Sequence, residues 1–176
     1  DVALEIGEMM KRILILLIII TAFITSCNDS TDPQEDYLTL KISPSDQTVN
    51  VDDQVTFSVV LKNAENLFAF SAELLFNGNI IELPENAVVA GDSWGENSIL
   101  TSVNEIDRLN ITVGLIQSSN VDAINGDITL FSFTLQGKAI GSSELWFQNI
   151  YLIDENGNPI QGIDDLEIKT GNITVQ

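Results

Sequence analysis

The sequence predicts an all-β sandwich of eight or nine strands, and three observations support this fold class. Apolar residues recur at every second position in one run after another, as expected of strands that bury one face. Turn-forming pairs separate several of these runs, namely Asn77-Gly78, Asn125-Gly126 and Asn156-Gly157. After Ile24 no stretch of useful length has a helical period.

The alternation begins near residue 38 and continues to the last residues. Seven runs carry it, and their apolar positions are Leu38, Leu40 and Ile42; Val55, Phe57, Val59 and Leu61; Phe68, Phe70, Ala72, Leu74 and Phe76; Leu109, Ile111, Val113 and Leu115; Phe131, Phe133 and Leu135; Leu145 and Phe147; and Ile173 and Val175. Polar or small residues occupy most positions between them. We therefore expect a single β domain over residues 38–176, which is long enough to bury a core.

The first 26 residues have the layout of a signal peptide. Lys11 and Arg12 form a basic start, and an apolar run follows over residues 13–24. A transmembrane helix needs about 20 apolar residues, so this run is too short to span a bilayer. Residues 1–8 precede Met9 and are acidic where a signal peptide is basic. We interpret them as an over-extended gene start.

The segment Ile24 to Cys27 resembles the bacterial lipobox, in which an aliphatic residue and two small residues precede a cysteine. Cys27 is the only cysteine of the chain and lies where the motif requires it. The alternative is an ordinary secretory peptide with an incidental cysteine. We predict that Cys27 becomes the lipid-attached first residue of the mature protein. The lipid would hold it at the bacterial cell envelope, facing the exterior or the outer membrane, and residues 27–37 would form an acidic, flexible linker.

The charge of the mature chain excludes several functions. From Cys27 onward it carries 23 acidic and five basic residues, a net charge of about −18. Such a surface repels nucleic acid and anionic lipid head groups. The sequence contains no histidine, which removes imidazole-based catalysis and the usual zinc sites. No motif singles out a catalytic pair of carboxylates, so we predict that the protein is not an enzyme.

Several segments together resemble a cohesin domain. They are residues 55–63, residues 67–77 with 79–82 after them, Gly91-Asp92, residues 125–135 and residues 170–175. Their order and spacing fit over nearly the whole of residues 38–176. The resemblance implies a nine-strand jelly-roll sandwich related to carbohydrate-binding modules. Cohesins are non-catalytic and receive a dockerin module on one sheet face, which docks enzymes of polysaccharide degradation onto a scaffold or cell surface.

The sequence departs from the family where cohesins present polar contacts to the dockerin. Ala69 and Ser71 occupy positions of outward Asn and Asp side chains, and Asn77-Gly78 replaces an Asp-Pro pair. We expect instead a flat, partly apolar protein-binding face. Its predicted residues are Ala69, Ser71, Glu73, Leu75, Thr112, Gly114, Ile116, Leu130 and Ser132. The alternative is that Leu75, Ile116 and Leu130 belong to the core.

Two other functions stay open from the sequence. A carbohydrate-binding module could stack a sugar ring on Trp94 or Trp146, although a tryptophan also packs well at the rim of a core. We expect Trp146 to point outward and favour rim packing for Trp94. The third class is a purely structural envelope domain.

Calcium is the only cofactor that the sequence leaves open. Residues 154–158 begin like an EF-hand loop, with Asp165 at its twelfth position. Pro159 stands where the sharp turn of that loop requires glycine, and no helices flank it. We favour a two-residue Asn156-Gly157 hairpin turn over a calcium site.

Overall fold

The computed structural model describes residues 37–117 and 121–176. Residues 36–176 form one compact unit. The predicted signal peptide, Cys27 and nearly all of the predicted linker lie outside the described residues, so their roles stay predictions. No helix within residues 37–117 or 121–176 is long and apolar enough to cross a membrane.

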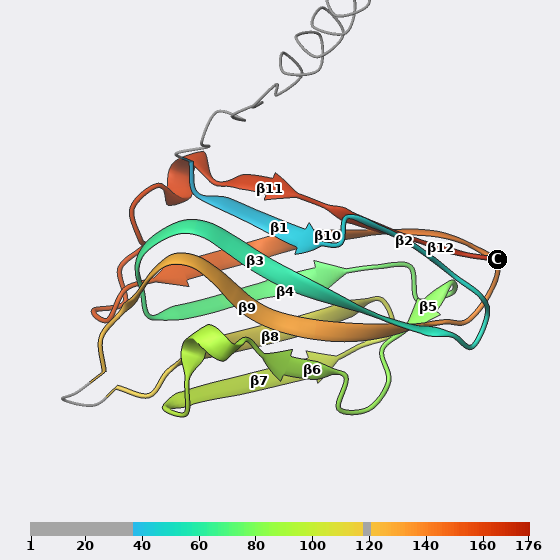
Figure 1. Cartoon of the computed structure of the whole chain (residues 1–176), viewed down its shortest axis with the longest axis horizontal. Coiled ribbons are helices and arrows are strands. Elements are labelled where there is room, and N and C mark those ends of the chain that lie inside the picture. The colour runs from blue at the N-terminus through green and yellow to red at the C-terminus, as the bar shows by residue number, and fades with distance from the viewer. Residues whose placement is uncertain (1–36, 118–120) are drawn as a thin grey trace, which may run out of the picture. The chain divides into compact units, whose positions relative to one another are not determined.

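The domain is a sandwich of two sheets (Figure 1). The first sheet contains, in spatial order, β11 (Glu167–Lys169), β1 (Thr39–Ser43), β3 (Gln54–Leu67), β9 (Ile124–Gly137) and β5 (Ile81–Glu82), with β6 (Val88–Ala90) also paired to β9. The second contains β2 (Asp46–Val49), β12 (Gly171–Val175), β10 (Gly141–Ile153), β4 (Ala69–Leu75), β8 (Arg108–Leu115) and β7 (Ser98–Asn104). The predicted jelly-roll sandwich is confirmed, and short segments such as β2, β5 and β11 add to its longer strands.

The core lies between the sheets and is built from the alternating apolar residues that the sequence predicts. Phe131 of the first sheet packs against two phenylalanines of the second: its ring centroid lies 6.0 Å from that of Phe70 and 6.5 Å from that of Phe147. Among residues 37–117 and 121–176, the buried apolar residues form one core that runs from Leu38 to Val175. The domain therefore contains its own core, and we expect residues 36–176 to fold without the segment before them.

The Asn125-Gly126 pair is not a hairpin turn, which corrects the sequence-based expectation. It lies inside β9, where Gly126 has a φ of 92° and faces Ala64 of β3. The register between β3 and β9 shifts on both sides of this pair. Glycine at positive φ permits such a bulge, because it has no Cβ to clash with the backbone.

Trp94 is part of the core, so its predicted alternative role in stacking on a sugar ring is wrong. It ends the short 3-10 helix η1 (Asp92–Trp94), and only 2 % of the residue is exposed. Its indole Nε1 donates a hydrogen bond of 2.7 Å to the backbone carbonyl of Leu130 in β9. The ring therefore covers the end of the first sheet and satisfies a buried carbonyl, which leaves no ring face for a ligand.

We predict that Trp94→Phe destabilises the domain by about 1–3 kcal/mol, because the buried Leu130 carbonyl loses its donor. Trp146→Phe is the matched control. Since Trp146 is 39 % exposed, its change should stay within about 0.5 kcal/mol. Urea unfolding of residues 36–176, followed by far-ultraviolet circular dichroism, measures both values. Equal destabilisation by the two variants would contradict this account of Trp94.

Candidate functional site

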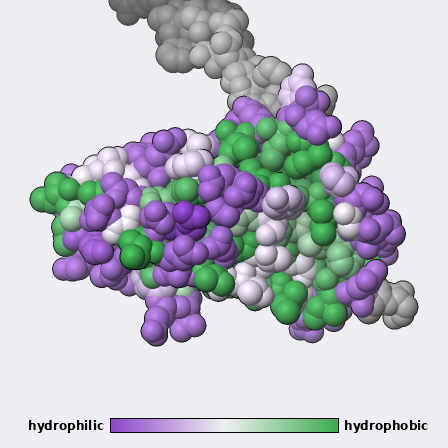
Figure 2. Space-filling view, turned by 180° about the vertical axis from the view of Figure 1, so that it is seen from behind, coloured by the Kyte–Doolittle hydropathy of each residue, from purple (hydrophilic) through white to green (hydrophobic). Residues whose placement is uncertain are grey.

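The outer face of the second sheet is the candidate site, and Figure 2 shows this side of the molecule. Strands β10, β4, β8 and β7 lie side by side, and their pairing places outward side chains in four rows. From one end to the other the rows are Trp146, Leu75 and Arg108; Gln148, Glu73, Asn110 and Val103; Tyr151, Ser71, Thr112 and Thr101; and Ile153, Ala69, Gly114 and Ile99. We call this surface the row face.

Seven of the nine residues predicted to bind a protein lie at this surface. Six of them belong to β4 and β8 and are neighbours across that pair, namely Ala69, Ser71, Glu73, Leu75, Thr112 and Gly114. Ile116 directly follows β8, and 53 % of it is exposed. The alternative that Ile116 belongs to the core is therefore wrong, whereas Leu75 is half-buried within its row. Their role in binding stays a prediction.

Leu130 and Ser132 do not belong to the row face, which corrects their assignment. Both lie in β9, and β9 pairs with β3, β5 and β6 in the first sheet. Leu130 is fully buried between the sheets. Ser132 points outward on the opposite side of the sandwich, where its Oγ lies 2.9 Å from that of Ser58. For Ser132, alternation gives the side of the strand but not the sheet that the strand joins. Leu130 is buried because β9 has a bulge there: Val59 pairs with Phe131 and Val60 with Thr129, which leaves Leu130 as the extra residue.

The charged side chains of the row face gather in its first two rows. Glu73 Oε2 accepts a hydrogen bond of 2.7 Å from Gln148 and lies 3.6 Å from the Arg108 guanidinium. The pKa of Glu73 lies below its usual value, chiefly because of the bond from Gln148, with further lowering by Asn149 and Arg108. Arg108 also lies within 3.6 Å of Glu105 and Asp107. This end is therefore acidic around one arginine.

The other end of the row face is free of charged side chains. Its last two rows carry none, and neither does Ile116 beyond them. Ile99 is 59 % exposed and Tyr151 is 62 % exposed. In Figure 2 green and white residues accordingly gather in the right half of the view, with purple residues at its edge, whereas purple residues predominate in the left half. We call the last two rows together with Ile116 the neutral half.

The neutral half is flat between its exposed rims. A Cβ on Gly114 would lie only 2.8 Å from the Cβ of Ala69, so a larger residue at 114 would force β4 and β8 to shift locally. Alanine and glycine opposite each other leave backbone close to the surface. A helix or strand of a binding partner can approach such a surface closely, while Ile99, Ile116 and Tyr151 offer apolar contact around it.

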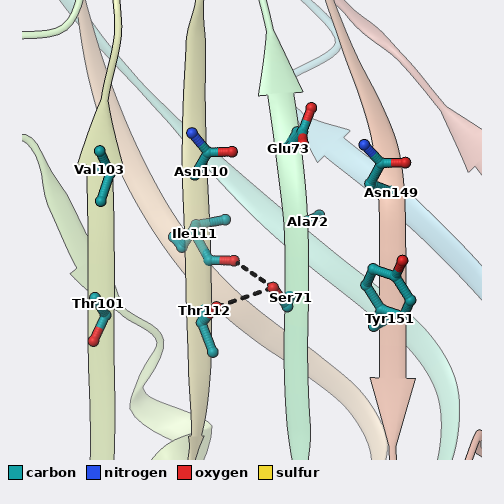
Figure 3. A pocket seen from close by; sticks show the side chains of 10 residues that line it. All are labelled: Ser71, Ala72, Glu73, Thr101, Val103, Asn110, Ile111, Thr112, Asn149 and Tyr151. Atoms are coloured by element: carbon teal, nitrogen blue, oxygen red, sulfur yellow. Dashed lines mark hydrogen bonds between the residues drawn. The ribbon is translucent and has the colours of Figure 1, made fainter.

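A shallow depression of about 200 Å³ crosses the second and third rows, where the charged rows meet the neutral half (Figure 3). Ser71 and Thr112 lie at its centre, and their hydroxyl oxygens are 2.9 Å apart. Ser71 also donates to the backbone carbonyl of Ile111 at 3.2 Å, so Thr112 must donate to Ser71. Tyr151 from β10 and Val103 from β7 stand on opposite sides. The depression can receive one protruding side chain of a partner.

Three residues of this face come from β7 and were missed by the sequence reasoning. Ile99, Thr101 and Val103 point outward and are exposed, while Leu100 is half-buried on the inner side. Apolar residues on both sides of β7 hide the alternation that marks other strands. The available signal was composition, since seven consecutive residues lack charge on a strongly acidic chain and include β-branched side chains.

Trp146 points outward, as the sequence predicts, and is 39 % exposed. It lies in the first row, beside Leu75 and at the charged end. An exposed tryptophan there keeps sugar stacking available, but the flat neutral half lies at the other end. Tyr151, on the same strand, is the more exposed aromatic residue.

The residues weighed for calcium form a turn. The Asp154 carboxylate accepts hydrogen bonds from the backbone N–H groups of Asn158, at 2.8 Å, and Asn156, at 2.9 Å. These hydrogen bonds lower the pKa of Asp154, and the bond from the backbone of Asn158 has the largest effect. The turn is wider than the predicted two-residue hairpin, because Asp154 N also donates to Asn158 O. Within residues 37–117 and 121–176, no group of three or more His, Cys, Asp or Glu side chains could hold a metal ion.

No sequence-family description and no curated protein matches the chain, but solved structures do. A non-cellulosomal cohesin from Archaeoglobus fulgidus shares 20 % identity at a TM-score of 0.63, covering 80 % of this chain and 91 % of its own. The sixth cohesin of scaffoldin B from Acetivibrio cellulolyticus, solved in complex with a variant Cel5 dockerin, shares 15 % sequence identity at a TM-score of 0.63. The match covers 80 % of this chain and 99 % of the cohesin chain.

A type II cohesin domain from the cellulosome of Acetivibrio cellulolyticus shares 14 % identity at a TM-score of 0.64, covering 78 % of this chain and 95 % of its own. These cohesins are distant from this chain in sequence, but the structural match extends over nearly the entire length of each of them. The two-sheet arrangement described above agrees with them. The chain therefore has a cohesin-type fold.

Proposed function

We propose that this protein is a non-catalytic module that binds a dockerin-type protein on the row face. The observation that carries the proposal is the neutral half. On a mature chain with a net charge of about −18, this surface has no charged side chain and exposes Ile99, Ile116 and Tyr151. Solved cohesins with the same fold include several in complex with dockerins, which supports a protein partner of that class.

The physical basis is burial of apolar surface without burial of unpaired charge. Each square ångström of apolar surface removed from water stabilises a complex by about 25 cal/mol before the costs of association. Exposed apolar side chains around a flat centre supply such surface, and the depression beside Ser71 and Thr112 can take an anchoring side chain. Glu73 and Arg108 lie at the edge of this area, where they can set the orientation of the partner.

We further propose that the protein acts at the cell surface in polysaccharide degradation. The lipobox-like segment that ends at Cys27 supports lipid attachment. Each buried methylene of a lipid chain contributes about 0.8 kcal/mol, so acyl chains can hold an acidic protein at a membrane whose head groups repel it. A linker between the lipid and the domain would leave the row face accessible to an enzyme that carries a dockerin.

The binding proposal predicts that Ile116→Asp abolishes capture of the partner, because the complex would then bury an unpaired charge. The bait is residues 36–176, incubated with proteins secreted by the native organism, and captured proteins are identified by mass spectrometry. We expect a protein with a dockerin module. Thr56→Asp is the matched control, because Thr56 is exposed on the outer side of the first sheet, and it should leave capture and melting temperature unchanged.

Two results would contradict this proposal. In the first, the Ile116→Asp variant still captures the partner but the Thr56→Asp variant does not. The partner would then bind to the outer side of the first sheet. The second is retention of the domain on a polysaccharide that Trp146→Ala abolishes, without capture of any protein. That result would support a carbohydrate-binding module.

The anchor proposal predicts that Cys27→Ala moves the protein from the membrane fraction to the soluble fraction, because no thiol remains for acylation. Metabolic labelling with a fatty acid, followed by fractionation of cells that express the full-length gene, measures both effects. Cys27→Ser serves as a second variant of nearly equal size. Continued labelling of either variant would show that lipid is attached elsewhere or that the motif is incidental.

A further inference from the structure

Strand β7 forms an open edge of the second sheet. Within the part of the chain that the structure describes, it pairs with β8 alone, over seven residues in one unbroken register. Backbone hydrogen bonds join Ile116 N to Asn97 O and Glu105 N to Arg108 O, one at each end of this pairing. Because alternate residues of an antiparallel strand bond to the same neighbour, Ile99, Thr101 and Val103 bond to β8. The N–H and C=O groups of Leu100 and Ser102 therefore point to the open edge.

This edge lacks the features by which proteins commonly prevent edge-to-edge pairing, which are charged side chains, proline, bulges and short length. The seven residues of β7 include no charge and no proline. The other edge strands of the described residues differ from it. β11 has three residues with Glu167 and Lys169 among them, β5 has two, β6 has three, and β2 has four with Asp46 at its start.

We propose that β7 is a homodimerisation edge, at which β7 of a second copy of this chain pairs antiparallel with it. The inference stands on the edge alone and does not depend on dockerin binding. A two-fold axis at Thr101 places Leu100 opposite Ser102 of the second copy, so their free backbone groups bond to each other. On the outer side, Ile99 then lies opposite Val103 of the second copy. These side chains are 59 % and 55 % exposed in the single chain, and the pairing covers both.

The charges that flank β7 agree with this register. Glu96 lies opposite Ile106 of the second copy, and Ile106 is 84 % exposed. Glu105 lies opposite Asn97 of the second copy, whose amide can donate to the carboxylate. No two acidic residues are directly opposite each other. Moving the axis by one residue to Ser102 would place Glu105 opposite Ile99 instead, which covers less apolar surface and desolvates the carboxylate.

The expected dimer is reversible. A standard stable interface buries about 1,200–2,000 Å² in total, and an edge of seven residues is smaller than that. Both copies are strongly acidic, so their repulsion opposes association and added salt screens it. Dimerisation should therefore increase with protein concentration and with sodium chloride. The two row faces would lie on the same side of one continuous sheet, which would present two docking surfaces together.

Sedimentation velocity of residues 36–176 over a wide concentration range tests the association. Amide hydrogen exchange by NMR in the same samples tests the location. We expect a monomer–dimer equilibrium in which the amides of Leu100 and Ser102 become protected as concentration rises. The amides of Ile99, Thr101 and Val103 should be protected at every concentration, because they already bond to β8. A monomer at all concentrations and salt levels overturns the proposal.

Two sets of variants test the edge and its register. Ser102→Pro removes an N–H that points away from β8 and should abolish the dimer while the fold persists. The double variant Ile99→Lys/Val103→Lys places lysines opposite each other across the axis. It should also be monomeric because these lysines repel each other, although the variant lowers the net negative charge of each copy. Ile99→Lys/Val103→Glu places lysine opposite glutamate and should keep the dimer.

The two lysine variants still decide the question if Ser102→Pro fails to fold, because both change only exposed side chains. A dimer that persists in Ile99→Lys/Val103→Lys would show that the interface lies elsewhere. Loss of the dimer in Ile99→Lys/Val103→Glu as well would show that the register is wrong. Either result overturns the proposal.

Discussion

Strand β4 is held on both sides, by β10 and by β8, and the register of these two ladders determines both the core and the row face. Inward, β4 buries Phe70, Ala72 and Leu74. Outward, it presents Ala69, Ser71 and Glu73. A slip by one residue would exchange the two sets, exposing a phenylalanine and burying a carboxylate. Contact of Phe70 with Phe131 and Phe147 opposes such a slip.

The same register separates charge from apolar surface on the outside. Glu73 meets Gln148 and Arg108 at one end of the row face, while Ala69 meets Gly114 at the other. Glu73 and Arg108 pair with each other across the first two rows, and the neutral half is left without ionic side chains. A partner that covers this half would displace water from apolar side chains and would not have to desolvate a carboxylate. In this account, specificity comes from shape and from charges at the rim.

Much of this arrangement could be predicted from the sequence, because alternation records which side of a strand is buried. The inner and outer residues of β4 and β8 were identified correctly in this way. The assignment of Leu130 and Ser132 failed because strand pairing depends on contacts between distant segments, which a local pattern does not contain. β9 alternates over Phe131, Phe133 and Leu135, yet it joins β3 in the opposite sheet. The same pairing places a bulge at Leu130, so that Leu130 and Phe131 are both buried.

Two further features depend on more than local patterns. In β7, the exposed Ile99 and Val103 make the outer side as apolar as the inner side, so the alternation that marks a half-buried strand is absent. Trp94 is buried because η1 folds its ring over the carbonyl of Leu130, a contact over 36 positions of the chain. Packing of Trp94 against the core was favoured from the sequence because its ring is large and amphipathic, but the carbonyl that its indole meets could not be predicted.

Methyl cross-saturation NMR on the complex with the captured partner tests directly whether the partner covers the neutral half. The domain is labelled at its methyl groups and the unlabelled partner is irradiated, so that only methyl groups in contact with the partner lose signal. If the partner covers the neutral half, the methyl signals of Ala69, Ile99 and Ile116 lose intensity and those of Val60 and Val89 in the first sheet stay unchanged. Loss at Val60 and Val89, with the row face unchanged, would contradict the account.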